Sequence, residues 1–199
     1  SAHATSAATN PLLADWTTEF GLPPFDAIAP EHFGPAFDAG MAAQRAEVDA
    51  IARQSAPPTF ANTIAALDSS GRLLGRVERT FYNLTASATD DALQSVERDV
   101  APKLAAHESA ILLDARLYAR IDALHAQRDA LGLDAEQRRL LERVHLDFRM
   151  AGAHLPEAAR ARLAAIAEEQ ATLQTQFSQN VLADEAGRVV ELTRPEDLD

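Results

Sequence analysis

The chain has 199 residues, enough for one large or two small domains with a substantial core. Its formal net charge of −12 argues against nucleic acid as a partner, because Lys and Arg drive binding to phosphates. The absence of cysteine excludes disulfides and thiolate metal sites, and no apolar run approaches the roughly 20 residues of a membrane-spanning helix, so we expect no membrane partner.

The first thirty residues are predicted to contain no long helix. Residues 1–10 are small and polar without periodicity, which predicts a disordered tail. Residues 11–30 contain four prolines and a glycine, which is typical of an extended arm. We expect its large apolar residues to hold this arm against the rest of the protein: Trp16, Phe20, Phe25 and Ile28.

Residues 57–89 are predicted to form one long amphipathic helix. Thr59 is suited to cap its start after two prolines, and the weak helix formers at 69–71 predict a kink. The apolar residues keep one face across that kink: Phe60, Ile64, Leu67, Leu74, Val77, Phe81 and Leu84.

The same periodicity predicts helices through the whole of residues 31–186. One helix precedes Pro57, with Phe33, Phe37, Met41, Val48 and Ile51 inward. Others begin at Asp90–Asp91 (with Pro102 kinking the helix), at Asp114 (ending at Gly132), at Asp134 (ending near Gly152) and at Pro156. The last is predicted to present an apolar face formed by Leu163, Ile166, Leu173, Phe177 and Val181.

The fold class predicted is therefore all-α, an antiparallel bundle-like array of about six to seven helices with a short β segment near the C-terminus. The β segment is RVVELT at 188–193, with 180–183 as a candidate partner across a turn at 184–187. Residues 187–199 would hold this strand and the start of a missing remainder, because the chain stops in a charged segment with no terminating signal.

Histidines are the natural candidates for chemistry, since they are common metal ligands and acid–base groups. The sequence holds no H-E-x-x-H, Gly-rich phosphate loop or G-x-S-x-G. His107 lies on an apolar stripe, which predicts a buried imidazole hydrogen-bonded to a neighbour. His3 in the tail and His32 beside Glu31 have no partner at ligand spacing.

A Glu-x-x-His pair, Glu142 and His145, has the spacing that supplies ligands to carboxylate-bridged metal pairs, and Asp122 and His125 repeat it. Such a site needs two more inward carboxylates, which the apolar stripes do not provide. Because Val144 lies on the core stripe, we expect this face to be solvated, with Arg138, Arg139, Glu142 and Arg143 in exposed ion pairs. We therefore assign no catalytic, metal or cofactor residue.

Several stretches in order resemble the N-terminal part of the thimet-oligopeptidase-like zinc metallopeptidases, in particular the bacterial peptidyl-dipeptidase (dipeptidyl carboxypeptidase) branch. They are NPLL at 10–13, PPFDAIAPEHFGPAF at 23–37, PPTFANTIAALDSSGRLL at 57–74, FYNLTASAT at 81–89, APKLAAHESAILL at 101–113, LYARI at 117–121, RDALGLDAEQRRLLE at 128–142, GAHLP at 152–156 and QFSQNVLAD at 176–184. Together they run nearly the length of the chain.

The resemblance implies a largely helical bacterial enzyme about three times as long, which removes dipeptides from the C-termini of oligopeptides in a deep cleft. It implies a catalytic zinc, held beyond Asp199 by H-E-x-x-H and a further Glu. This segment would be an inactive N-terminal domain that forms part of the cleft wall and contacts the C-terminal catalytic part.

Two questions stay open at this stage. The enzyme would be periplasmic or cytoplasmic; the missing initiator Met and the Ala-rich start lean towards a removed signal peptide and the periplasm. The alternative to an enzyme segment is a free-standing, non-catalytic helical binding or scaffold domain.

Overall fold

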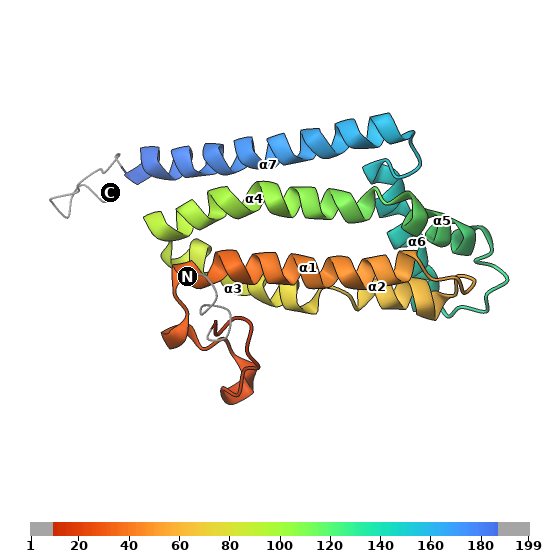
Figure 1. The fold of residues 1–199 in the computed structure, drawn as a ribbon, viewed down its shortest axis with the longest axis horizontal. Helices are drawn as coiled ribbons and strands as arrows, with labels where there is room; N and C mark the ends of the chain where they lie inside the picture. Colours follow the sequence, from red (N-terminus) through yellow and green to blue (C-terminus); the bar gives the residue numbers. More distant parts are fainter. Residues whose placement is uncertain (1–9, 187–199) are drawn as a thin grey trace, which may run out of the picture.

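A computed structural model describes residues 10–186, and its long helices lie side by side in alternating directions (Figure 1). Helix α1 runs away from the arm, α3 returns beside it, α4 runs parallel to α1, and α7 returns along the outer side of α4. The shorter α5 and α6 pack together at one end. The helices are α1 (Phe33–Ala52), α2 (Ala66–Asp68), α3 (Arg72–Ala88), α4 (Asp91–Leu112), α5 (Ala115–Ala126), α6 (Ala135–Ala151) and α7 (Glu157–Ala186). The predicted helical bundle is confirmed.

One hydrophobic core joins the arm to α1, α3 and α4. Phe81 of α3 lies edge-on to Phe33 and Phe37 of α1, with ring centroids 5.0 and 5.3 Å apart. Leu12 of the arm is fully buried with them. The arm therefore belongs to the core through Leu12.

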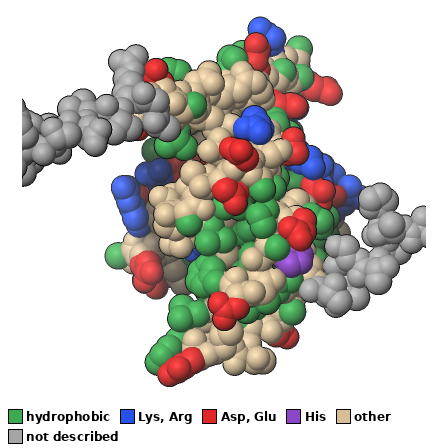
Figure 2. Space-filling view, turned by 90° about the vertical axis from the view of Figure 1, so that its left-hand side faces the viewer, with side chains coloured by type: hydrophobic (Ala, Val, Ile, Leu, Met, Phe, Trp, Pro, Cys, Tyr) green, Lys and Arg blue, Asp and Glu red, His purple; other side chains and the backbone are tan. Residues whose placement is uncertain are grey.

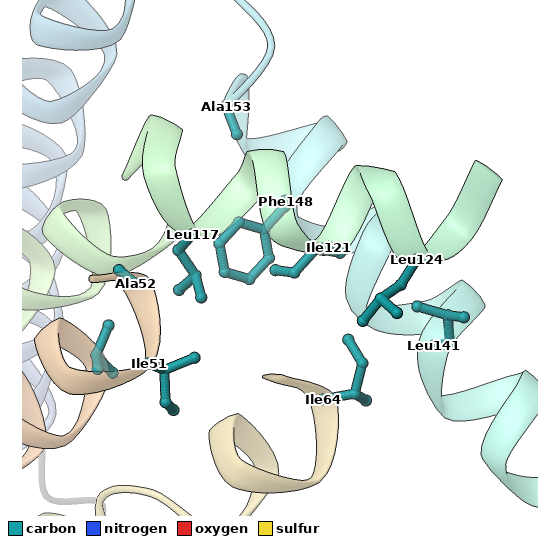
Figure 3. Close-up of a cluster of buried hydrophobic side chains, with 10 residues drawn as sticks. Ile51, Ala52, Ile64, Leu117, Ile121, Leu124, Leu141, Phe148 and Ala153 are labelled. Atoms are coloured by element: carbon teal, nitrogen blue, oxygen red, sulfur yellow. The ribbon is translucent and has the colours of Figure 1, made fainter. Parts of the chain in front are cut away.

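A second core lies at the end formed by α5 and α6. Ile64, Leu117, Ile121 and Leu141 are fully buried there and point towards one another (Figure 3). Helix α1 reaches this cluster with Val48 and Ile51, so it connects the two cores. The cluster fixes the crossing of α5 and α6 against the long helices.

The segment 57–89 forms two helical pieces instead of the single kinked helix that was predicted. Thr59 caps the first piece as expected, accepting a hydrogen bond from the Asn62 backbone N–H at 3.1 Å. This piece begins as a π-helix (Phe60–Ala65) and continues as α2. Gly71 then adopts a left-handed φ of 73°, so the backbone leaves the helix before α3 begins.

The aspartates predicted to begin helices do so. Asp90 accepts from the N–H of Leu93, Asp114 from that of Leu117 and Asp134 from that of Gln137, at 2.8 to 3.2 Å. The predicted end of α5 at Gly132 is wrong, because the helix ends at Ala126 and residues 127–132 form turns.

The arm docks only partly as predicted. Phe20 is 87% exposed and Phe25 is 45% exposed, so neither pins the segment. Trp16 and Ile28 are half-buried and pack against the core, as predicted. The arm is also held by Leu12 and by Asn10, whose side-chain amide donates to the His32 carbonyl at 2.8 Å. Asn10 was assigned to the disordered tail, but it is buried because its side chain is fully engaged in these backbone contacts. Short 3-10 turns follow at Glu19–Gly21, Phe25–Ala27 and Pro30–His32.

Helix α7 begins one residue after Pro156 and packs chiefly against α4. Residues 180–183, the suggested strand partner, lie inside this helix, so that pairing is wrong. The predicted strand at 188–193 and residues 1–9 of the predicted tail lie outside the described residues. Among residues 10–186, no strand is present and no helix has the length and apolar character of a membrane span.

Candidate functional site

The candidate metal residues of α5 and α6 are partly brought together, but as a histidine pair. The rings of His125 and His145 stack at 3.7 Å between centroids with an angle of 3°. His145 Nε2 lies 3.0 Å from Asp122 Oδ1. His145 is buried, which corrects the prediction of a solvated position. It is buried because α5 lies against this side of α6 and supplies the second ring.

The electrostatics of this pair favour a neutral His125. Burial is the largest cause that lowers the pKa of His125, and the charges of the neighbouring His145 and Arg128 lower it further. The carboxylates of Asp122 and Glu142 act in the opposite direction. A neutral imidazole can stack on its neighbour without charge repulsion.

The geometry does not assemble a metal site in the described part of the chain. No group of three or more His, Asp or Glu side chains there is arranged to hold an ion. The expected ion pairs form only in part: Arg138 pairs with Asp129 and Arg143 with Asp147, at 2.7 and 2.9 Å.

His107 is buried between α4 and α1, as predicted. Its Nε2 lies 2.7 Å from Gln44 Oε1, while its Nδ1 is buried without a hydrogen-bond partner. Burial, and then the charge of Arg45, lower the pKa of His107. This environment suits a neutral structural imidazole.

A groove of about 1120 Å³ runs between the arm and α3. Arg72, Arg76 and Arg79 line it from one face of α3, since they are four and three residues apart. The arm contributes an apolar wall of Trp16, Leu22, Pro23 and Phe25. Sequence inspection missed this site, although the arginine spacing on a predicted helix was a usable signal.

Arg76 fastens the arm to the groove. Its Nη2 donates to the Leu12 carbonyl at 2.7 Å, and its guanidinium lies 4.7 Å from the centre of the Trp16 ring. Trp16 in turn donates from Nε1 to the Pro11 carbonyl at 2.9 Å. Arg76 therefore holds Trp16, one residue of the apolar wall, against α3.

The last helix, α7, carries an apolar surface that the described residues leave open. Leu173 is 58% exposed and Phe177 is 68% exposed, and Ile166, Val181 and Leu182 are also exposed. A hollow of about 590 Å³ between α7 and α4 continues onto this surface through Ile166. None of residues 157–185 is buried. Of the predicted apolar face, Leu163 is half-buried and lines the hollow towards α4, whereas Ile166, Leu173, Phe177 and Val181 are exposed.

Other apolar side chains are exposed at the end of the bundle from which the arm projects. Figure 2 views this end, where hydrophobic side chains gather between acidic groups. Two further exposed apolar side chains line the hollows described above: Leu22, 55% exposed, in the groove beside the arm, and Tyr82, 41% exposed, in the hollow between α7 and α4. Such exposure is typical of surfaces that meet a ligand or partner.

Comparison with known proteins finds relatives that match most of this chain. The chain is 44% identical over 176 residues to a dipeptidyl carboxypeptidase of Salmonella typhimurium and 45% identical over 174 residues to one of Escherichia coli, which is 88% and 87% of this chain. The chain is a homologue of the dipeptidyl carboxypeptidases. Oligopeptidase A of Salmonella typhimurium is a more distant relative, 30% identical to this chain over 174 residues. The resemblance read from the sequence is confirmed.

The homology covers only part of those proteins. The chain spans about a quarter of the length of these curated relatives: 26% of both dipeptidyl carboxypeptidases and 25% of oligopeptidase A. No family model matches the chain. The match to these relatives therefore covers most of this chain but only a segment of each relative.

Proposed function

We propose that this chain is the N-terminal helical domain of a zinc metallopeptidase that releases C-terminal dipeptides from oligopeptides. The observation that carries the proposal is the 44–45% identity to two dipeptidyl carboxypeptidases, against 27–30% to oligopeptidases A. The higher identity favours dipeptide release over other oligopeptidase activity.

In this proposal the segment holds no catalytic group. H-E-x-x-H is absent from the sequence, and the residues 10–186 offer no cluster of ligands that fits zinc. A zinc ion would be held by residues beyond Asp199, where it would supply Lewis-acid activation of water and the scissile carbonyl. The segment alone is then inactive.

The proposed role of the segment is to form one wall of the substrate cleft. Helices α1, α4 and α7 have 20, 22 and 30 residues, so at 1.5 Å per residue they extend about 30, 33 and 45 Å. Because these helices lie side by side, they give a long surface (Figure 1). The open apolar surface of α7 is where the catalytic part of the same protein would pack.

Two measurements test this assignment. The encoding gene should continue past the codon for Asp199 into a reading frame that contains H-E-x-x-H. The 199-residue chain, equilibrated with zinc, iron and manganese and freed of loosely bound ions, should hold no stoichiometric metal.

Opposite results would contradict the proposal. A gene without the motif would favour a non-catalytic scaffold. One or two ions per chain, lost in Glu142→Gln or His145→Gln but retained in Glu136→Gln, would place a metal site in α6 instead.

A further inference from the structure

The groove between the arm and α3 has a charge opposite to that of the chain. Three arginines and one carboxylate, Asp68, line it, whereas the whole chain has a formal net charge of −12. Arg72 and Arg79 are exposed and make no hydrogen bond or ion pair with any described residue. Cations left unpaired beside a hollow in an acidic protein favour an anionic ligand.

The start of α3 lies at the groove, where Ser70, Gly71 and Arg72 line it. Glu47 of α1 accepts a hydrogen bond from the Gly71 N–H at 2.7 Å, and its carboxylate offsets the partial positive charge of this helix end. The preference of the groove for an anion therefore rests on the arginine side chains and not on the helix N-terminus.

Gly75 allows Arg79 to lie back along the helix towards these groups. A Cβ at position 75 would lie 3.2 Å from Arg79 Nη1, tighter than ordinary packing. Glycine within a helix costs about 1 kcal/mol relative to alanine, so its presence here needs a local reason. One such reason is the space that Gly75 leaves for the Arg79 guanidinium.

The opposite wall is apolar and aromatic, which a small inorganic anion would not use. Leu22 is 55% exposed and Phe25 45% exposed, and both line the groove with Trp16. A ligand that fills about 1120 Å³ and contacts both walls must carry anionic groups along one side and apolar groups along the other.

We propose that this groove binds an extended acidic peptide, with its carboxylates on Arg72 and Arg79 and its apolar side chains on Trp16, Leu22 and Phe25. That the peptide is a substrate rests on the proposed function; the anionic and apolar character of the ligand rests on the groove alone. A nucleic acid is disfavoured because its continuous phosphates would extend beyond the groove over an acidic surface.

Trp16 provides a built-in probe, because it is the sole tryptophan of the chain and lines the groove. The 199-residue chain is titrated with an acetylated hexapeptide of alternating Glu and Phe, and Trp16 fluorescence is recorded. Saturable quenching or a spectral shift is expected. In Arg72→Gln/Arg79→Gln we expect a dissociation constant raised by about fivefold to tenfold, because two charge pairs are lost.

Matched variants and ligands make the test specific. Arg139→Gln/Arg149→Gln removes two exposed arginines of α6 and should bind like the unaltered chain. The hexapeptide with Gln in place of Glu should bind as weakly to the unaltered chain as the acidic peptide binds to the groove variant. Circular dichroism checks that both double variants fold.

Three outcomes would overturn the proposal. The first is a Trp16 fluorescence that shows no saturable change, or a dissociation constant that rises equally in the two double arginine variants. The second is tighter binding of a single-stranded oligonucleotide than of the peptide. The third is that the protein translated from the whole gene does not bind the peptide, as measured by fluorescence anisotropy of a labelled peptide. That result would mean that another segment of the same polypeptide occupies the groove. None of these bears on dipeptide release, which is assayed separately.

Discussion

At Gly40, helices α1 and α3 approach so closely that no side chain fits between them. A Cβ at this position would lie 2.9 Å from the backbone Cα of Leu74. We expect Gly40→Ala to lower the free energy of unfolding by about 1–3 kcal/mol, since the helices must separate. Urea unfolding monitored by circular dichroism measures this.

Gly34, also in α1, is the control for that substitution. A Cβ there meets nothing within 4 Å, so Gly34→Ala should raise the free energy of unfolding by up to about 1 kcal/mol through helix propensity. A stabilising Gly40→Ala would contradict the close packing of α1 on α3.

His107 makes the stability of the fold depend on pH. Burial lowers the pKa of His107 in the folded state, while the unfolded chain has the ordinary value of about 6.5. Below pH 6.5 the unfolded state therefore binds a proton that the folded state resists, and stability falls as the pH decreases. Above that value both states are neutral and this contribution is constant.

The test compares urea unfolding at pH 7.5 and 5.5. His107→Gln cannot titrate, so we expect a smaller loss of stability between the two pH values than in the unaltered chain. His125, whose pKa is lowered as well, contributes a residual slope that His107→Gln/His125→Gln should reduce further. An unchanged slope in both variants would contradict the assignment of these imidazoles as neutral.

At the scale of the element, the helix starts depend on single aspartates. Asp134 caps α6, accepting from the Gln137 N–H at 2.8 Å while the Gln137 side chain accepts from the Asp134 N–H at 3.2 Å. Asp134→Ala should lower the free energy of unfolding by about 1 kcal/mol.

Asp99→Ala removes a carboxylate from the exposed middle of α4 and serves as the comparison for Asp134→Ala. We expect it to change the free energy of unfolding by less than about 0.5 kcal/mol. If both substitutions changed the free energy of unfolding equally, the cap of α6 would add no stability beyond the loss of one negative charge.

Helix starts and inward stripes were predictable because they depend on neighbouring residues. Asp90 and Asp134 cap through backbone groups three residues away, and the stripe of Phe33 and Phe37 follows the helical repeat. His145 was misplaced because its burial depends on His125 of another helix. The arginine groove likewise needs the arm to return to α3, a contact between residues about 60 positions apart.

For the whole molecule, the outward apolar surface of α7 predicts self-association of the 199-residue chain. Leu173→Gln/Phe177→Gln should reduce the associated fraction in sedimentation velocity without loss of helicity, because both side chains are exposed. The control Leu146→Gln/Met150→Gln, on exposed positions of α6, should leave association unchanged. Equal effects of the two pairs would argue against α7 as the contact.

The central claim is that the chain is a non-catalytic part of a peptidase that releases C-terminal dipeptides. The decisive measurement is mass spectrometry of an oligopeptide incubated with the protein translated from the whole gene, with and without a zinc chelator, and with the 199-residue chain alone. We predict successive loss of C-terminal dipeptides with the whole protein, abolished by the chelator, and an intact peptide with the chain alone. An intact peptide with the whole protein, or dipeptide release by the chain alone, would contradict the account.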